Sequence, residues 1–532
     1  MARTAPVIDT VFERPRIYDG MANRTFETDV GIVDGRIALI GDLSERDAIT
    51  RIDAHGLALA PGFIDVHSHS DELWLVDARC AGKILQGVTT EVGGNCGSSV
   101  APLEGLSLEH RRADMRAYAL DITWGNFDGF FAEVEHDPPA LNVASLVGLG
   151  TVRRCVRGDR EGPLDEDEMR VERRLVREAV EQGALGVSSG LIYVPSRFAN
   201  LYELTECARE ASAAGAPRYA SHLRSEGDEL LSAVEECLEI GRRAGVALQF
   251  SHHKSAWKRN WGKVERSLAR IERARADDIA CNADVYPYVA MWTDLDTLLP
   301  EDAILGGREA TVARLRDPAT AAALALRLEL DHAGTWHDVQ ITTVASERNA
   351  GLAGMRVDEI ARLWRLTPPR AVIRLLLEER LAVQAIFFAM SEDDVATVLT
   401  APFTCIGSDA SARAIDGPTA RGVPHPRTFG CFPRVFGRFV RGRHTLTLEE
   451  AVRRMTSLPA DAFGLRDRGR IALGAYADLV LFDVERILDR ATYDAPYAYP
   501  SGIEAVFVNG TAVVRDGEMT GARPGRVLRN GR

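Results

Sequence analysis

Short apolar segments rich in β-branched residues recur along the middle of the chain, each followed by small or polar residues and then by a stretch with helical periodicity. This alternation is typical of parallel strands connected by helices. Eight such segments can be counted, the number that closes a (β/α)8 barrel. They are ALAPGFIDVHSHS (58–70), VTTEVGGNCG (88–97), NVASLVGLG (142–150), ALGVSSGLIY (184–193), PRYASHLRSE (217–226), VALQFSHHKS (246–255), IACNADVYPY (279–288) and PFTCIGSDAS (402–411).

The stretches between these segments predict helices, and one connection is too long for a single helix. Residues 164–183, LDEDEMRVERRLVREAVEQG, open with carboxylates and end in glycine, as helix termini favour. Residues from about 293 to 345 include the helical stretch PEDAILGGREATVARLRDPATAAALALRLEL. We therefore expect a helical insertion after the seventh strand, at the end of the barrel where insertions commonly cover the active site.

The two ends of the chain show a different pattern from the middle. VDGRIALIGD (33–42), ADLVLFDVERILD (477–489) and IEAVFVNGTAVVRDGEMTG (503–521) are short strands around Gly and Asp-Gly turns. The sequence thus predicts an α/β protein with two parts. Residues 61–465 form the TIM-type barrel, and residues 1–60 and 466–532 together form a small β-sandwich domain.

Composition narrows the class of protein. The 532 residues are 46% hydrophobic, with a formal charge of -13 and acidic and basic residues interleaved, so we expect no nucleic-acid partner. No stretch approaches the ~18 uncharged apolar residues of a membrane span, and charges interrupt the first residues before any signal-like run. The eight cysteines stand singly, without a C-x-x-C pair. We expect reduced thiols and a cytoplasmic protein.

Histidine, cysteine and aspartate gather at the ends of the predicted strands. In a barrel these ends converge on one pocket, and imidazole, thiolate and carboxylate are the groups that bind zinc. The chain has only 12 histidines, so their recurrence at strand ends indicates a metal site. The candidate ligands are His67, His69, Cys96, His222, His252 or His253, and Asp409.

Each of these signals is weaker when taken alone. His67 and His69 lie two residues apart, so both rings face the same side of a strand. Strand alternation allows only one histidine of SHHK to face the pocket, and we choose His252 by analogy with the Ser-His pair of YASHLRSE. Cys96 by itself would be read as a buried apolar residue, and Asp409 as a helix cap.

Several segments together make the chain resemble the N-acyl-D-amino-acid deacylases, or D-aminoacylases, of the amidohydrolase superfamily. The resemblance runs from about residue 60 to about residue 440, and ADLVLFD extends it into the terminal β-domain. The segments are PGFIDVHSHSDE, QGVTTEVGGNCGSSVAPL, GALGVSSGLIYVPSRFA, YASHLRSE, FSHHKSAWKRNWGKV, DVYPY, IGSDAS and PHPRTFGCFPRV.

The resemblance implies a zinc enzyme with one tight metal position and a second, weaker one. The tight zinc ion would be held by Cys96, His222 and His252. The weaker position would use His67, His69 and Asp409, with the Cys96 sulfur bridging in place of the carboxylated lysine of many related hydrolases.

The resemblance also assigns roles toward the substrate. Asp409 would be the general base and acid. Lys254 and Tyr288 would lie near the scissile amide and carboxylate, and Arg427 would receive the α-carboxylate, which a planar guanidinium pairs with bidentately. Tyr193 would line the side-chain pocket. The expected reaction is hydrolysis of an N-acyl-D-amino acid, a small-molecule substrate.

Two other functions stay open at this point. One is hydrolysis of a cyclic ureide, as in hydantoinases and dihydroorotases, and the other is a non-catalytic metal-binding barrel. The chain also departs from the family: the link between Asp409 and Arg427 is longer than usual, and SDA replaces the common SDG. The link bears on substrate class. The preferred side chain and acyl group, the number of catalytic metals and the oligomeric state are not readable from the sequence.

Overall fold

Parallel strands in the middle of the chain are arranged as a ring. The computed structural model describes residues 7–531. Its strands follow the order β8-β9-β10 in one sheet and β11-β12-β13-β14-β15-β19 in the other, with all pairs parallel. Their bounds are β8 Phe63–Asp65, β9 Val88–Gly93, β10 Asn142–Ser145, β11 Val147–Gly148, β12 Val187–Gly190, β13 Arg218–His222, β14 Ala247–Phe250, β15 Cys281–Val285 and β19 Thr404–Ile406.

The segments that follow β8 and β19 pair with each other and so close the ring. There, Ser68 and Ala410 form an isolated parallel bridge. Strands β10 and β11 belong to one apolar segment that is interrupted at Leu146, so this segment pairs with β9 on one side and β12 on the other. The predicted α/β barrel is confirmed, and its strands fall within the eight predicted segments.

Helices pack around the ring in chain order. The main ones are α4 Phe127–His136, α5 Leu149–Arg157, α6 Glu166–Glu181, α7 Leu201–Ala213, α8 Leu230–Ala244, α9 Lys263–Ala276, α15 Glu392–Thr400, α16 Arg427–Arg434, α17 Leu448–Met455 and α18 Ser457–Phe463. The carboxylates that predict the start of α6 form its N-terminal cap, because the Asp165 side chain accepts from the backbone N–H of Glu168 and the Glu168 side chain returns the bond.

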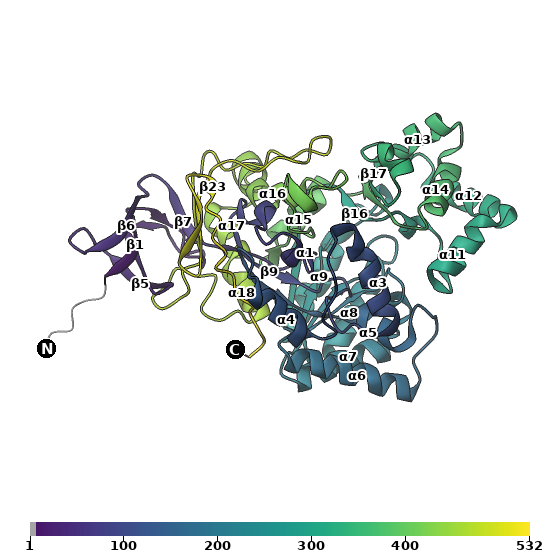
Figure 1. Cartoon of the computed structure of the whole chain (residues 1–532), viewed down its shortest axis with the longest axis horizontal. Helices are drawn as coiled ribbons and strands as arrows, with labels where there is room; N and C mark the ends of the chain where they lie inside the picture. Colours follow the sequence, from purple (N-terminus) through teal and green to yellow (C-terminus); the bar gives the residue numbers. More distant parts are fainter. Residues whose placement is uncertain (1–6, 532) are drawn as a thin grey trace.

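Two sheets, one of N-terminal strands and one of strands from both ends of the chain, form the small β-domain at one end of the elongated molecule (Figure 1). One has the order β5-β4-β1-β6, and the other has the order β23-β22-β21-β20-β7-β2-β3. The bounds are β1 Ile8–Glu13, β2 Arg16–Ile17, β3 Phe26–Glu27, β4 Asp29–Val33, β5 Arg36–Gly41, β6 Ala48–Asp53, β7 Ala58–Pro61, β20 Leu479–Phe482, β21 Ile503–Val508, β22 Thr511–Arg515 and β23 Glu518–Met519. Phe12 and Phe507 meet between the sheets with ring centroids 5.1 Å apart, as in a sandwich.

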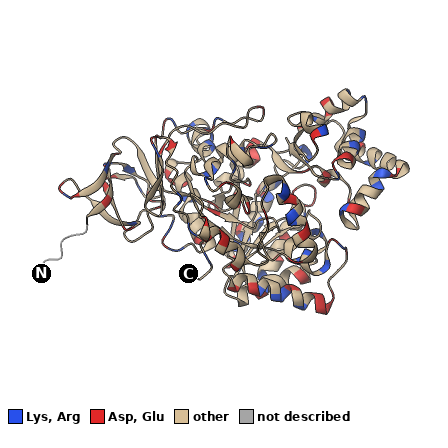
Figure 2. Cartoon of the chain, viewed as in Figure 1, with Lys and Arg blue, Asp and Glu red and all other residues tan. Residues whose placement is uncertain are grey.

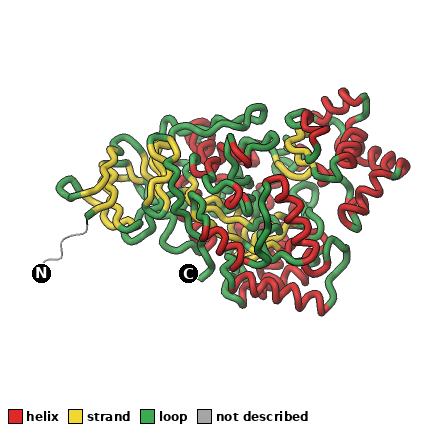
Figure 3. The backbone as a smooth tube through the Cα atoms, viewed as in Figure 1, coloured by secondary structure: helices red, strands yellow, loops and turns green. Residues whose placement is uncertain are grey.

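The insertion after β15 lies at the opposite end of the molecule and is larger than expected. It begins with β16 (Met291–Asp294) and runs to β18 (Val383–Phe387), well beyond residue 345, with its own hydrophobic cluster. It includes an antiparallel sheet, β16-β18-β17, beside its helices, visible in Figure 3 as a separate group of strands. The other elements are α10 Glu301–Ile304, α11 Gly307–Arg316, α12 Pro318–His332, β17 Val339–Val344, α13 Val357–Trp364 and α14 Pro368–Glu378.

Charged residues of both signs alternate along the outer helices. Figure 2 shows them interleaved on the barrel helices such as α6 and on the insertion, without a continuous basic face in this view. Within residues 7–531, none of the helices is both long and apolar enough to cross a bilayer.

Candidate metal centre and active site

Six potential metal ligands converge at the carboxyl ends of five barrel strands. Two of them follow β8 and one follows β9; of the others, one ends β13, one follows β14 and one follows β19. They form two groups that share Cys96, and within each group one ligand atom per residue lies within 4.8 Å of all the others. The groups are Cys96, His222 and His252, and His67, His69, Cys96 and Asp409.

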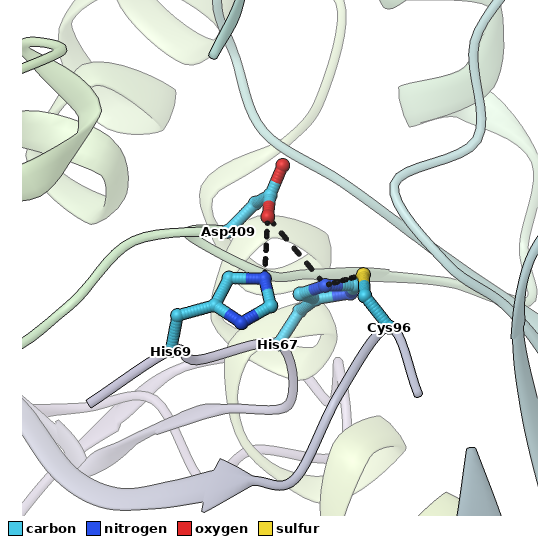
Figure 4. A group of neighbouring side chains, drawn as sticks. All are labelled: His67, His69, Cys96 and Asp409. Atoms are coloured by element: carbon cyan, nitrogen blue, oxygen red, sulfur yellow. Dashed lines mark hydrogen bonds and ion pairs between the residues drawn. The ribbon is translucent and has the colours of Figure 1, made fainter. Parts of the chain in front are cut away.

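Two histidine nitrogens lie close to the Cys96 sulfur. The Cys96 Sγ lies 3.3 Å from His67 Nε2 and 3.4 Å from His252 Nε2. On the other side of the cluster, His69 Nε2 is 3.0 Å from Asp409 Oδ1 (Figure 4). His253 turns away from the cluster and its Nε2 bonds Ser267 Oγ at 2.7 Å. Of the two histidines in SHHK, the one facing the pocket is His252.

Three of these residues adopt left-handed backbone conformations that residues other than glycine rarely take. The φ angles are 52° for Cys96, 35° for His252 and 51° for Asp409. Such conformations cost on the order of 1–3 kcal/mol each and persist where the surrounding structure enforces them. They occur just after β9, β14 and β19, where the chain turns out of each strand and directs the side chain into the mouth of the barrel.

The charges in the cluster favour a thiolate and a carboxylate. Burial raises the pKa of the Cys96 thiol, but the neighbouring His67 and His252 outweigh burial and leave this pKa well below its ordinary value. Burial also raises the pKa of Asp409, and the Arg427 guanidinium, 3.0 Å away, brings it well below its usual range. Both groups are thus in the ionised form that binds metals.

The donor set fits zinc. His222 is buried, and neither of its ring nitrogens has a hydrogen-bond partner among residues 7–531. An unsatisfied buried imidazole costs free energy that a bound metal ion recovers. One thiolate and two imidazoles are ligands that zinc prefers, and a zinc ion held by these three residues would keep a position for water or substrate.

Two carboxylates that the sequence interpretation missed hold the histidines in place; Asp284 is buried and Glu226 is partly buried. Asp284 Oδ1 lies 3.0 Å from His67 Nδ1, and Glu226 Oε1 lies 2.9 Å from His252 Nδ1. Histidine ligands of metals usually donate their second ring N–H in this way, which fixes the ring and its tautomer. Both acids stood inside recognised segments, DVYPY and YASHLRSE. An acid within an apolar strand, or just after one, was the available signal.

A cleft of about 1820 Å³ opens above the cluster and is walled partly by the insertion. Lys254 lines the cleft, and its Nζ lies 2.7 Å from His252 Nδ1. Tyr193 also lines it, and its hydroxyl bonds Thr293 Oγ1 at 2.8 Å. Arg427 reaches the cleft from the start of α16 although it is 1% exposed.

Of the two tyrosines in DVYPY, Tyr286 lines the cleft, and the predicted Tyr288 does not. The Arg427 guanidinium stacks on the Tyr286 ring at 4.4 Å. The Tyr288 hydroxyl points to Pro426 O at 3.4 Å, and its ring packs against Arg434 outside the cleft lining. Strand β15 ends at Val285, so strand alternation does not extend to residue 288.

Comparison with known proteins gives consistent matches over nearly the whole chain. The model of the Amidohydrolase family matches residues 50–514. An N-acyl-D-glutamate deacylase from Alcaligenes xylosoxydans xylosoxydans is 39% identical, with 98% of this chain and 96% of that protein covered. The crystal structure of N-acyl-D-glutamate deacylase from Bordetella bronchiseptica, complexed with zinc and a phosphonate mimic of the tetrahedral intermediate, matches with a TM-score of 0.85 at 35% identity and covers 98% and 100% of the two chains. A D-aminoacylase with a binuclear metal centre, described as activated by one metal and attenuated by the second, matches with a TM-score of 0.82 at 34% identity and the same coverage.

Proposed function

Since the chain belongs to the amidohydrolase family, we propose that it is a zinc-dependent N-acyl-D-amino-acid deacylase. It hydrolyses the amide bond of an N-acyl-D-amino acid and releases a carboxylic acid and a free D-amino acid. The observation that carries this proposal is that two groups of potential metal ligands share the Cys96 sulfur. Asp409, a member of one group, also pairs with Arg427. The 39% sequence identity to an N-acyl-D-glutamate deacylase, over 98% of this chain, supports the proposal.

We assign the tight zinc position to Cys96, His222 and His252, and a weaker second position to His67, His69 and Asp409. A thiolate, and not a lysine, lies where the two groups meet. This supports a linear amide as substrate over the cyclic ureides of lysine-bridged hydrolases. When bound, zinc supplies a nucleophilic hydroxide from water at neutral pH and polarises the acyl carbonyl.

Asp409 is the proposed base and acid. Its carboxylate takes the proton of the attacking water and gives it to the departing nitrogen, so one water molecule is consumed for each amide bond broken. In the free enzyme Arg427 holds the pKa of this carboxyl low, after the opposing effect of burial. A substrate carboxylate that shares the guanidinium of Arg427 draws part of that charge away, and the pKa of Asp409 rises toward the range of a useful base.

The substrate's α-carboxylate binds at Arg427. The Nε and Nη1 atoms of this buried guanidinium have no hydrogen-bond partner among the described residues 7–531. A planar guanidinium offers donors in a fork that matches a carboxylate. The Tyr286 ring beneath it fixes the plane of the fork. Lys254 beside His252 and Tyr193 at the cleft wall complete the proposed substrate contacts.

The test uses the zinc-loaded enzyme with a panel of N-acetyl-D-amino acids, their L-enantiomers and hydantoins. We expect turnover of D-enantiomers alone. Asp409→Asn should lower kcat by about 10²–10⁴ and keep its zinc, since general acid-base catalysis contributes that range. Asp416→Asn, exposed in the same segment, is the matched control and should turn over normally. Hydantoin turnover in place of N-acyl-D-amino acid turnover would refute the proposal, and so would an active Asp409→Asn enzyme.

All eight cysteines are free thiols. We propose a cytoplasmic location on this basis, because reducing compartments keep thiols unpaired.

A further inference from the structure

The long link between Asp409 and Arg427 places a second buried arginine in the cleft. Arg413 is 7% exposed and lines the same cleft as Arg427. Its Nη1 donates to the backbone carbonyl of Arg421 at 2.9 Å. Its Nε is buried without a hydrogen-bond partner among residues 7–531. Among these described residues, no acidic side chain forms a salt bridge with Arg413.

Two other arginines along the cleft differ from Arg413, because their charges are already neutralised. Arg154 pairs with Asp159 at 2.8 Å, and Arg259 pairs with Asp228 at 2.9 Å. A buried guanidinium without a counter-ion pays a desolvation cost that a bound anion would offset. Arg413 is therefore placed to receive a negative charge from a ligand.

Trp292 brings the two buried arginines to one part of the cleft. The guanidinium carbon of Arg413 lies 5.4 Å from the centre of the indole ring, and that of Arg427 lies 5.9 Å from the same centre. Trp292 belongs to β16, the first strand of the insertion, and lines the cleft. A small molecule with two carboxylates a few atoms apart can reach both guanidiniums.

We propose that Arg413 binds a side-chain carboxylate and makes the enzyme selective for N-acyl-D-amino acids with acidic side chains, D-glutamate or D-aspartate. The inference rests on the proposed deacylase function. Arg427 holds the α-carboxylate, and Arg413 holds the second one. An uncharged side chain of the same shape leaves the Arg413 charge buried and unpaired, which penalises its binding.

The experiment compares kcat/KM for N-acetyl-D-glutamate with that for N-acetyl-D-glutamine, and the aspartate and asparagine pair, in the wild-type and Arg413→Met enzymes. We expect the wild type to favour the acids by on the order of 10²-fold, the scale of a charged hydrogen bond. Arg413→Met should lose most of this preference through its activity on the acids and keep its activity on the amides. Arg466→Met removes an exposed arginine that does not line the cleft and should retain the preference.

Different outcomes would overturn the role of Arg413 and the deacylase function. Equal wild-type turnover of acids and amides, or an Arg413→Met variant that loses both equally while its zinc content and melting temperature stay normal, would overturn the role of Arg413 alone. Retained turnover of amides by Arg413→Met shows that the variant is folded. An absence of turnover on every N-acyl-D-amino acid would refute the deacylase proposal itself.

Discussion

At the scale of single residues, Cys96 differs from the other cysteines of the chain. Burial raises the pKa of Cys80, Cys405 and Cys431, in keeping with neutral thiols inside the core. Burial acts in the same direction on Cys96, but two imidazoles reverse its effect on the pKa. Of these thiols, Cys96 therefore has the surroundings of a metal ligand.

Cys96→Ala removes the only sulfur shared by both ligand groups, and we expect its zinc affinity to fall by more than about 100-fold, because even partners behind the ligands are worth roughly 10- to 100-fold. Zinc content after dialysis, and titration against a competing chelator, measure the change. Cys405→Ala, buried in an apolar cluster, is the matched control and should keep its zinc. A full zinc complement in Cys96→Ala would contradict the ligand assignment.

Site residues could be predicted where local spacing in the sequence was informative, and were missed where their position depends on contacts with other strands. His67 and His69 could be selected because two histidines spaced two residues apart at the end of a predicted strand are expected to point to one side. Glu226 and Asp284 could not, since acids are usually exposed and their burial depends on partners from other strands. Tyr288 was assigned from the family resemblance, whereas the structure has Tyr286 in the cleft lining; which of the two faces the cleft depends on where β15 ends.

At the scale of elements, one buried lysine connects the strands that carry the second ligand group. Lys83, on α2 (Ala81–Ile84), contacts Asp65 at 2.7 Å at the end of β8 and Glu91 at 2.8 Å in β9. Its Nζ also donates to Ser408 Oγ at 2.7 Å and to Ala410 O at 2.9 Å, on either side of Asp409. All three charged side chains are fully buried. Lys83 thus positions the loop that carries the proposed base.

Lys83→Met should accordingly affect both stability and catalysis. It leaves two buried carboxylates without their cation, a change that typically costs about 3–5 kcal/mol of unfolding free energy. Urea unfolding measures this cost, and kcat should fall with it while KM changes little, because the base is displaced and the cleft is not. Lys258→Met, at an exposed position, should match the wild type. A Lys83→Met enzyme with normal stability and kcat would show that this network has no positioning role.

The apolar segments predicted where barrel strands lie, but not every element built from them. The first segment holds two strands, of which β7 joins the terminal β-domain and β8 the ring. The strands of the insertion went unpredicted because β16, MWTD, is half-buried along its whole length and lacks clear alternation. Its role as a wall of the cleft depends on tertiary packing that periodicity does not report.

At the scale of the whole molecule, the proposed ligands come from strands on several sides of the ring. His67 and Asp409 stand at the seam where the chain after β8 meets the chain after β19, and Asp409 N donates to His67 O at 2.8 Å. His222 ends β13, and His252 is the second residue after β14. Both strands lie away from this seam in the order of the ring. The insertion packs its own apolar cluster and contributes none of the six ligands.

Removing zinc should therefore loosen the barrel mouth and leave the insertion unchanged. A ligand that binds only the folded state stabilises it by RT ln(1 + [L]/Kd), about 4 kcal/mol at 1,000 times Kd, so a chelator should lower the melting temperature of the barrel by several degrees. Backbone amide hydrogen exchange should become faster in peptides that cover the carboxyl ends of β9, β13 and β19. It should stay constant in peptides from α11 to α14. The same chelator should shift Cys96→Ala very little, because that variant holds little zinc to lose. Faster exchange spread evenly over the barrel and the insertion would place the metal's contribution elsewhere, and an identical shift in both enzymes would exclude Cys96 from the site.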